Sequence, residues 1–280
     1  MNHALGTRTT LVLLAPVVVL LLAMFAYPLG VVAWTSLYDP AAGGISIAAY
    51  RKLADSTLFY RVLGNTLQIG VSSTVVALLL GYVVALHLAR LDARRRTFYL
   101  VMVMLPFWTS ILVKSYAFAI VLGEQGLINR GLVAVFGDAA RTELIYNRVG
   151  VVIGMANFLL PFIVFPVLAS LLAQNRSLHR VAEIMGAGPL RVFWSVTFPL
   201  SLPGVVAGAL MAMTLSTGMY ITPALLGGRK DMMMANLVDF YTRQTLDWAL
   251  ASAIAMVLLV LSSVLIVLLL KVRADERVAA

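Results

Sequence analysis

Long blocks of apolar residues alternate with short polar segments along this chain of 280 residues. The apolar positions fill whole blocks and are not limited to one face of a helix or to alternate positions of a strand. This pattern predicts helices surrounded by lipid. Because a bilayer core requires about 20 apolar residues in a helix, six blocks are long enough to cross it: residues 11–34, 65–89, 98–121, 149–172, 204–226 and 249–270.

The composition agrees with a membrane protein. Hydrophobic residues make up 61% of the chain and charged residues only 12%, and the mean hydropathy is +0.96. A soluble domain of this size would have too few polar residues to cover its apolar surface. We therefore predict an all-α integral membrane fold in which residues 1–280 form a single transmembrane domain. The first block is longer than the apolar region of a signal peptide, so we expect it to remain as a span.

Charge and cysteine content exclude several other classes of protein. The chain has no cysteine, and its three histidines are scattered, so we expect neither disulfides nor a metal site. The net charge of +9 would suggest nucleic acid binding in a soluble protein. Here the basic residues gather in short loops, as cytoplasmic loops do. The shortest loop carries Arg90 and residues 94–96, which predicts that both termini are cytoplasmic and that nucleic acid is not a partner.

The loop of residues 173–203, between the fourth and fifth spans, is too polar to cross the membrane and too apolar for a solvated linker. Ser177 can cap a helix over residues 178–185. Either Gly186 or Gly188 can end that helix in the left-handed conformation. The loop is therefore expected to begin with a short helix and a sharp bend.

A second short helix is expected over residues 189–198. Pro189 is favoured at a first helical position, and Pro199 is expected to end the helix. The first helix carries an apolar stripe at i, i+3, i+4 and i+7, formed by Leu178, Val181, Ala182 and Met185. This stripe could rest on the membrane surface or be held by a soluble partner.

This loop resembles the signature of the membrane subunits of binding-protein-dependent ABC importers. That signature is Glu-Ala-Ala, three residues, Gly, nine residues, Ile, one residue, Leu-Pro. With the family glycine placed on Gly186, the first three positions hold Arg180, Val181 and Ala182, and Pro199 takes the last position. Segments similar to the spermidine/putrescine-type permeases of this family occur at residues 106–117, 126–129 and 222–228.

The resemblance implies that the bent loop docks in a cleft of an ATPase subunit and transmits its nucleotide-driven movement to the membrane helices. It implies this coupling role for Arg180, Val181, Ala182, Glu183, Gly186, Ala187 and Pro199. The implied partners are two ATPase subunits that bind the ATP, a second, distinct permease subunit, and an extracytoplasmic solute-binding protein. The implied location is the inner membrane of a bacterial cell. The chain itself lacks a Gly-x-x-x-x-Gly-Lys-Ser/Thr loop, so we expect no ATPase activity and no cofactor of its own.

One position departs from the family signature. Family members usually have Glu where this chain has Arg180, and that acid is expected to pair with a basic residue of the ATPase. Two hypotheses account for the change. Either the charge on the partner is inverted, or Glu183, one turn later on the same face, takes over the pairing.

Lys114 is the one charge inside a predicted span. It could extend outward to water or line the pathway, and we favour extension, because a cation pathway gains nothing from a positive charge unless that charge is a gate. No carboxylate falls inside a predicted span, which disfavours a proton-driven cation carrier. The candidate pathway residues are Trp108, Lys114, Asn157, Thr217, Tyr220 and Thr222.

The resemblance makes a polyamine, spermidine or putrescine, the leading substrate. An opine, a phosphonate and ferric iron are the alternatives within the same class of importer. Two other classes remain as rivals: a secondary transporter or channel that works without an ATPase, and a membrane scaffold that binds a partner but moves no solute.

Overall fold

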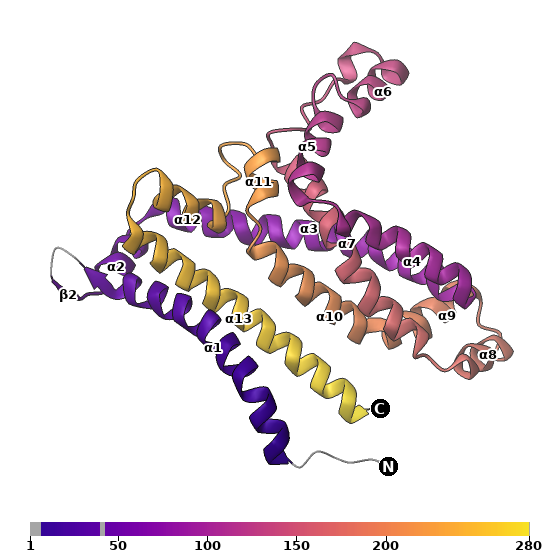
Figure 1. The fold of residues 1–280 in the computed structure, drawn as a ribbon. Helices are drawn as coiled ribbons and strands as arrows, with labels where there is room; N and C mark the ends of the chain where they lie inside the picture. The colour runs from indigo at the N-terminus through magenta and orange to yellow at the C-terminus, as the bar shows by residue number, and fades with distance from the viewer. Residues whose placement is uncertain (1–6, 40–42, 280) are drawn as a thin grey trace. The chain divides into compact units, whose positions relative to one another are not determined.

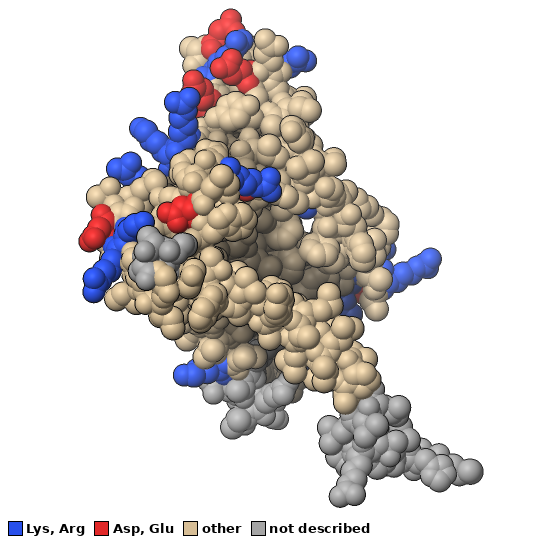
Figure 2. Space-filling view, turned by 60° about the vertical axis from the view of Figure 1, so that its left-hand side comes forward, with Lys and Arg blue, Asp and Glu red and all other residues tan. Residues whose placement is uncertain are grey.

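The computed structural model describes residues 7–39 and 43–279, and it is almost entirely helical (Figure 1). His3 lies outside these residues. Within the described part of the chain, six helical stretches are long and apolar enough to cross a membrane: Leu14–Leu37, Thr57–Arg90, Ile111–Phe136, Arg148–Leu172, Pro189–Thr217 and Trp248–Lys271. The fold is thus the predicted all-α membrane fold. Figure 2 shows wide stretches of surface without charged side chains, as lipid-facing helices require.

The chain divides into two compact units, Met1–Thr57 with Val238–Val257, and Leu58–Leu237 with Leu258–Ala280. The first unit holds α1 (Thr7–Leu37), β1 (Tyr38–Asp39), β2 (Gly44–Ile45), α2 (Ala48–Ala54) and parts of α12 (Met234–Arg243) and α13 (Trp248–Ala279). The two short strands pair antiparallel, with Tyr38 opposite Ile45. The Tyr50 hydroxyl donates to Ser36 Oγ at 3.0 Å, which ties α2 to α1.

The second unit contains most of the helices. Its elements are α3 (Thr57–Arg90), α4 (Ala93–Trp108), α5 (Ile111–Leu122), α6 (Leu127–Phe136), a 3₁₀ turn (Asp138–Ala140), α7 (Arg148–Leu172), α8 (Arg176–Ile184), α9 (Pro189–Val192), a π-helical turn (Phe193–Thr197), α10 (Phe198–Thr217) and α11 (Ile221–Leu226). Helices α12 and α13 are shared between the two units.

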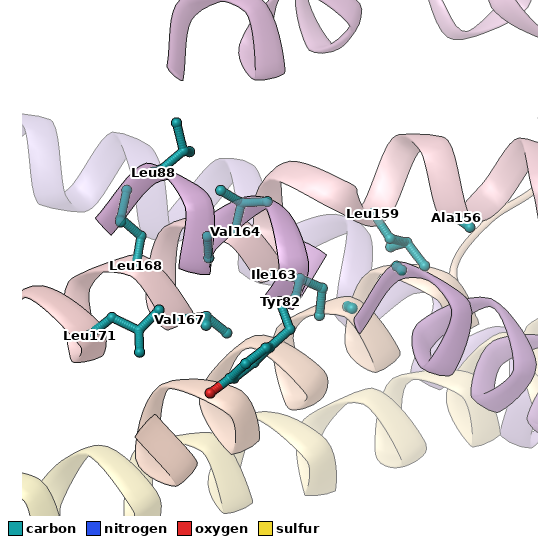
Figure 3. Close-up of a cluster of buried hydrophobic side chains, with 12 residues drawn as sticks. Tyr82, Leu88, Ala156, Leu159, Ile163, Val164, Val167, Leu168 and Leu171 are labelled. Carbon is teal, nitrogen blue, oxygen red and sulfur yellow. The ribbon is translucent and has the colours of Figure 1, made fainter. Parts of the chain in front are cut away.

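The core of the second unit lies among α3, α7 and α10 (Figure 3). Buried side chains from α7, such as Ile163 and Val167, meet Tyr82 of α3 and Ala212 of α10. Helices α7 and α10 pack along each other, and glycine makes this close approach possible. A Cβ atom on Gly204 would lie 2.5 Å from the backbone oxygen of Pro166, so only glycine fits there.

Two of the predicted spans are interrupted. The prediction of one continuous helix over residues 98–121 is wrong, because α4 ends at Trp108 and α5 begins at Ile111. At the break, Thr109 has an extended backbone and its hydroxyl donates to the carbonyl of Pro106 at 2.7 Å. The prediction over residues 204–226 is wrong for the same reason, since α10 ends at Thr217 and α11 begins only at Ile221.

Candidate functional site

Helix α8 forms the first arm of a bent pair of helices, which we call the elbow (Arg176–Thr197). The Asn175 side chain accepts a hydrogen bond from the backbone N–H of Ser177 at 3.0 Å and so caps the helix. At the other end, the N–H of Ala187 bonds to the carbonyl of Ala182 at 3.0 Å, and that of Gly186 to the carbonyl of Glu183 at 2.9 Å. This double closure needs a left-handed residue, and Gly186 supplies it with φ of 79°.

The helix predicted for this arm is present, but it begins two residues earlier than expected. The cap is Asn175, where Ser177 was expected, and α8 runs over Arg176–Ile184 where residues 178–185 were expected. Of the two candidate glycines, Gly186 makes the bend, because Gly188 has an ordinary extended backbone with φ of −66° and ψ of 165°.

The second arm does not end at Pro199 as predicted. Pro189 begins α9, as expected, but the chain then continues through the π-helical turn into α10 without a break. The N–H of Phe198 bonds to the carbonyl of Phe193, five residues back. This wider turn makes room for the ring of Pro199, which would otherwise clash with the preceding helical turn. The elbow is therefore joined directly to a membrane-spanning helix.

The outer face of the elbow is apolar and uncovered. Ile184 and Met185 are more than four-fifths exposed, and Leu190 is nearly as exposed. Leu178 and Val181 of the predicted stripe lie on this face, but Ala182 is half-buried on the inner side, as is Ala187. We call the outer residues the docking face: Leu178, Val181, Ile184, Met185 and Leu190.

The two charged residues beside the docking face are both exposed. Arg180 and Glu183 form no ion pair with any side chain that the structure describes. Both are therefore open to a partner, and the two hypotheses for the missing family acid remain predictions.

The interrupted helices meet each other in the second unit. Helix α5, which follows the first break, packs against α11, which follows the second. Their buried hydroxyls, Ser115 Oγ and Thr222 Oγ1, lie 3.4 Å apart in a hydrogen bond. On the opposite side, Gly154 of α7 lets α11 approach, because a Cβ there would lie 2.9 Å from the Thr222 methyl group. Thr222 of α11 thus lies between α5 and α7.

Lys114 lies one residue before this contact and points into the second unit. Its Nζ sits 5.2 Å from the centre of the Phe158 ring, in a cation–π arrangement. Phe158 lies ten positions into α7, and its ring meets those of Phe107 and Phe162. A neighbouring aromatic face thus contacts the ammonium group of Lys114, and outward extension of this side chain remains a prediction.

Asn157 is half-buried on α7 next to Phe158 and lines an apolar pocket of about 460 Å³. The pocket is enclosed by α3, α4 and α7, and its other polar groups are His87 and Tyr99. The His87 and Tyr99 rings meet edge to face with their centres 6.1 Å apart. Asn157 thus lines a pocket that Lys114 does not line, although its sequence neighbour Phe158 contacts Lys114.

The remaining candidates do not line this pocket. Trp108, at the end of α4, is 82% exposed and does not line the pocket. Thr217 is fully buried at the end of α10, with its hydroxyl bonded to the Thr214 carbonyl and 3.3 Å from Ser262 Oγ of α13. Tyr220 stands between α10 and α11, and its carbonyl accepts from Asn236 at 3.1 Å.

Sequence analysis missed a polar cluster at the end of α7 opposite the elbow. The Arg148 guanidinium donates to Asp231 at 3.2 Å, to Gln68 at 2.6 Å and to Asn65 at 2.8 Å. Asn65 in turn donates to the carbonyl of Lys230 at 2.6 Å. The cluster joins α3, α7 and the loop before α12. The polar run that begins at Asn65 was visible in the sequence, but its partners lie 80 or more positions away.

The fold defines a multi-pass membrane protein with an exposed elbow joined to a spanning helix. The family of binding-protein-dependent transport system inner membrane components matches residues 77–280. The chain belongs to this family, and it is a multi-pass inner membrane protein.

The similar proteins include permeases from two kinds of transport system. The chain is 28% identical to the spermidine/putrescine transport system permease protein PotB of Haemophilus influenzae, over 86% of this chain and 79% of that protein. PotB of Escherichia coli is 29% identical over 78% of each. The chain is also 30% identical to the 2-aminoethylphosphonate transport system permease protein PhnU of Salmonella typhimurium, named there as putative, over 92% of this chain and 90% of that protein.

Solved structures share the fold. A chain in a crystal structure of a bacterial alginate ABC transporter, in complex with an alginate pentasaccharide-bound periplasmic protein, superimposes with a TM-score of 0.76. It is 17% identical, and the match covers 92% of this chain and 91% of that one. At this identity the likeness concerns the fold alone.

Proposed function

We propose that this chain is one of two membrane-spanning subunits of an ATP-driven importer that receives its solute from an extracytoplasmic binding protein. The observation that carries the proposal is the elbow. Its docking face is uncovered, and its second arm continues through the π-helical turn into α10. A protein docked on this face would pull directly on a membrane-spanning helix.

In this proposal residues 1–280 act as one permease domain with both termini in the cytoplasm. Two ATPase subunits bind the ATP, and this chain needs no cofactor. The second membrane-spanning subunit is a distinct permease. Arg90 at the end of α3 and arginines 94–96 in the first turn of α4 support the orientation, because short connections rich in arginine stay on the cytoplasmic side.

We propose a polyamine as the solute, on the strength of the PotB relatives. Discontinuous helices in transporters commonly meet where the solute passes. We therefore assign the pathway to the region where α5, α7 and α11 meet, with Lys114 and Thr222 in it, and to the neighbouring pocket of α3, α4 and α7 that Asn157 lines. Lys114 acts as a gate there, since its positive charge opposes the passage of free cations.

A phosphonate is the second candidate solute. The PhnU relative matches a larger share of this chain than the PotB relatives do. A lysine on the pathway would also attract an anionic phosphonate.

Uptake by the complete complex tests the proposal. Proteoliposomes would contain this chain, the second permease and the ATPases, and would receive the binding protein with labelled spermidine, putrescine or 2-aminoethylphosphonate. We expect uptake of a polyamine only when ATP and the binding protein are both present. Uptake of only the phosphonate would replace the polyamine assignment. Uptake without ATP would support a secondary transporter, and no uptake of any solute would contradict the importer proposal.

A further inference from the structure

We propose that His179 and Thr197 form the link that makes the docking helix α8 and the spanning helix α10 move as one body. The inference rests on the proposed function, because it concerns how movement of a docked ATPase reaches the membrane. His179 and Thr197 are positioning residues in this mechanism and touch neither ATP nor solute.

The two arms of the elbow are joined by side chains as well as by the bend at Gly186. His179 Nε2 on α8 lies 3.1 Å from Thr197 Oγ1, the last residue of the π-helical turn. Gln174, just before α8, donates to the backbone carbonyl of the same Thr197 at 3.0 Å. Three segments therefore converge on Thr197: the end of α7, the docking helix and the start of α10.

This convergence occurs where the backbone of the second arm is weakest. The π-helical turn is closed by a bond over five residues, and Pro199 and Pro203 lack the N–H groups that would continue the helical ladder. A force applied to α8 could bend the chain at this turn. The contact from His179 to Thr197 bypasses the turn and prevents such bending.

The histidine occupies this position at a cost in stability. Its Nδ1 atom is buried and has no hydrogen-bond partner in the described structure. An unpaired buried polar atom costs free energy that an apolar side chain of similar size, such as leucine, would not. Only the histidine can make the hydrogen bond to Thr197, because leucine has no polar atom. This favours a functional role for His179.

Tyr82 of α3 packs against the residues on both sides of Thr197 and can transmit its movement to α3. The Tyr82 ring of α3 packs edge to face on Phe193 and lies against Phe198, with ring centres 6.0 and 5.9 Å apart. Its hydroxyl lies 2.9 Å from Ser201 Oγ on α10, in a buried hydrogen bond. The link thus connects the docking face to both α3 and α10.

Spin-label distances test the link without depending on the solute. The chain contains no cysteine, so labels at Ser177→Cys on α8 and Leu215→Cys on α10 would be the only labels on this subunit. In the complete complex we expect one narrow distance distribution that ATP binding leaves unchanged. Thr197→Val and His179→Leu should each broaden or shift this distribution when ATP binds. An unchanged distribution in both variants would overturn the inference.

Transport efficiency gives the second readout. Loss of this one part-buried hydrogen bond should lower the solute moved per ATP by about fivefold in Thr197→Val and His179→Leu. Thr197→Ser and His179→Gln keep the bonding groups and should restore it. Ser170→Ala is the matched control, because Ser170 Oγ donates to the Leu200 carbonyl at 3.2 Å and joins α7 to α10 without involving α8. An equal fall of uptake and ATP hydrolysis in the two disrupting variants would contradict the link.

Different results would contradict the proposed function and the His179–Thr197 link. If the ATPases do not co-purify with the unmodified chain, or if it shows no ATP-dependent uptake, the proposed function is wrong. If the unmodified complex works and the disrupting variants keep both their label distances and their efficiency, only the link is wrong.

Discussion

Gly186 is the residue on which the shape of the elbow depends. Its φ of 79° lies in the left-handed region, and no atom lies within 4 Å of the place where a Cβ would stand. The requirement for glycine therefore comes from the backbone and not from crowding. Gly188, two positions later, also has open space around it but an ordinary backbone.

Gly186→Ala should weaken docking of the ATPase. Alanine in the left-handed region costs about 1 kcal/mol, so we expect about a fivefold loss of ATPase affinity in a pull-down titration. Gly188→Ala is the matched control and should bind normally. Equal affinities for both variants would contradict a role for the bend in docking.

Lys114→Met should make the closed complex leak. A positive charge near a narrow pathway raises the energy of a passing cation by up to about 4 kcal/mol at 4 Å in a partly polar environment. Removing it should raise passive K⁺ flux from ATP-free proteoliposomes by on the order of tenfold, and Lys114→Arg should preserve the barrier. If the flux in Lys114→Met equals that of the unmodified complex, the lysine does not face the pathway.

At the scale of elements, sequence analysis predicted the spanning helices and the elbow because both depend on local patterns. Apolar blocks, a capping side chain and a glycine followed by a proline act over a few residues. The interruptions at Thr109 and at Gly218 were missed because the apolar block runs through each of them. The contact of Lys114 with Phe158 was missed because Phe158 belongs to another helix.

The polar cluster around Arg148 could not be predicted for the same reason, and it holds α3, α7 and the loop before α12 together. Asp231 is 8% exposed, so its carboxylate depends on Arg148 for pairing. The Arg148 side chain is itself 42% exposed, and solvent screens part of the interaction.

Arg148→Gln should destabilise the second unit by about 1–2 kcal/mol, because the nearly buried Asp231 loses its cation. A lower midpoint of thermal unfolding of the detergent-solubilised chain would show this. Arg229→Gln provides the comparison, since Arg229 is exposed and near the same loop, and its midpoint should not move. Identical midpoints for the two variants would mean that the cluster adds no stability.

At the scale of the whole molecule, the described residues include exposed apolar surfaces. The docking face is one of them. Helix α1 is another, because its side chains from Leu14 to Leu29 are exposed along the whole length. Exposed apolar area on a helix of this kind fits contact with lipid or with another subunit.

Ile184→Asp should abolish co-purification of the ATPase without changing the thermal unfolding of the isolated chain. A carboxylate at an apolar contact must be desolvated without a partner, whereas in the free chain it remains in water. Leu127→Asp, on an exposed position of α6, is the control and should leave ATPase binding intact. Arg180→Glu and Glu183→Arg, made singly, distinguish the two charge hypotheses. If none of the three elbow variants affects association, the docking face lies elsewhere.

The two interruptions in the spanning helices also have a consequence for water. A helix end leaves backbone N–H and C=O groups unbonded, and hydrocarbon offers them no partners. The breaks at Thr109 and at Gly218 must therefore face protein or a hydrated space. Lipid alone therefore cannot surround these two helices at the depth of their breaks, and the course of the backbone itself requires packed protein or water there.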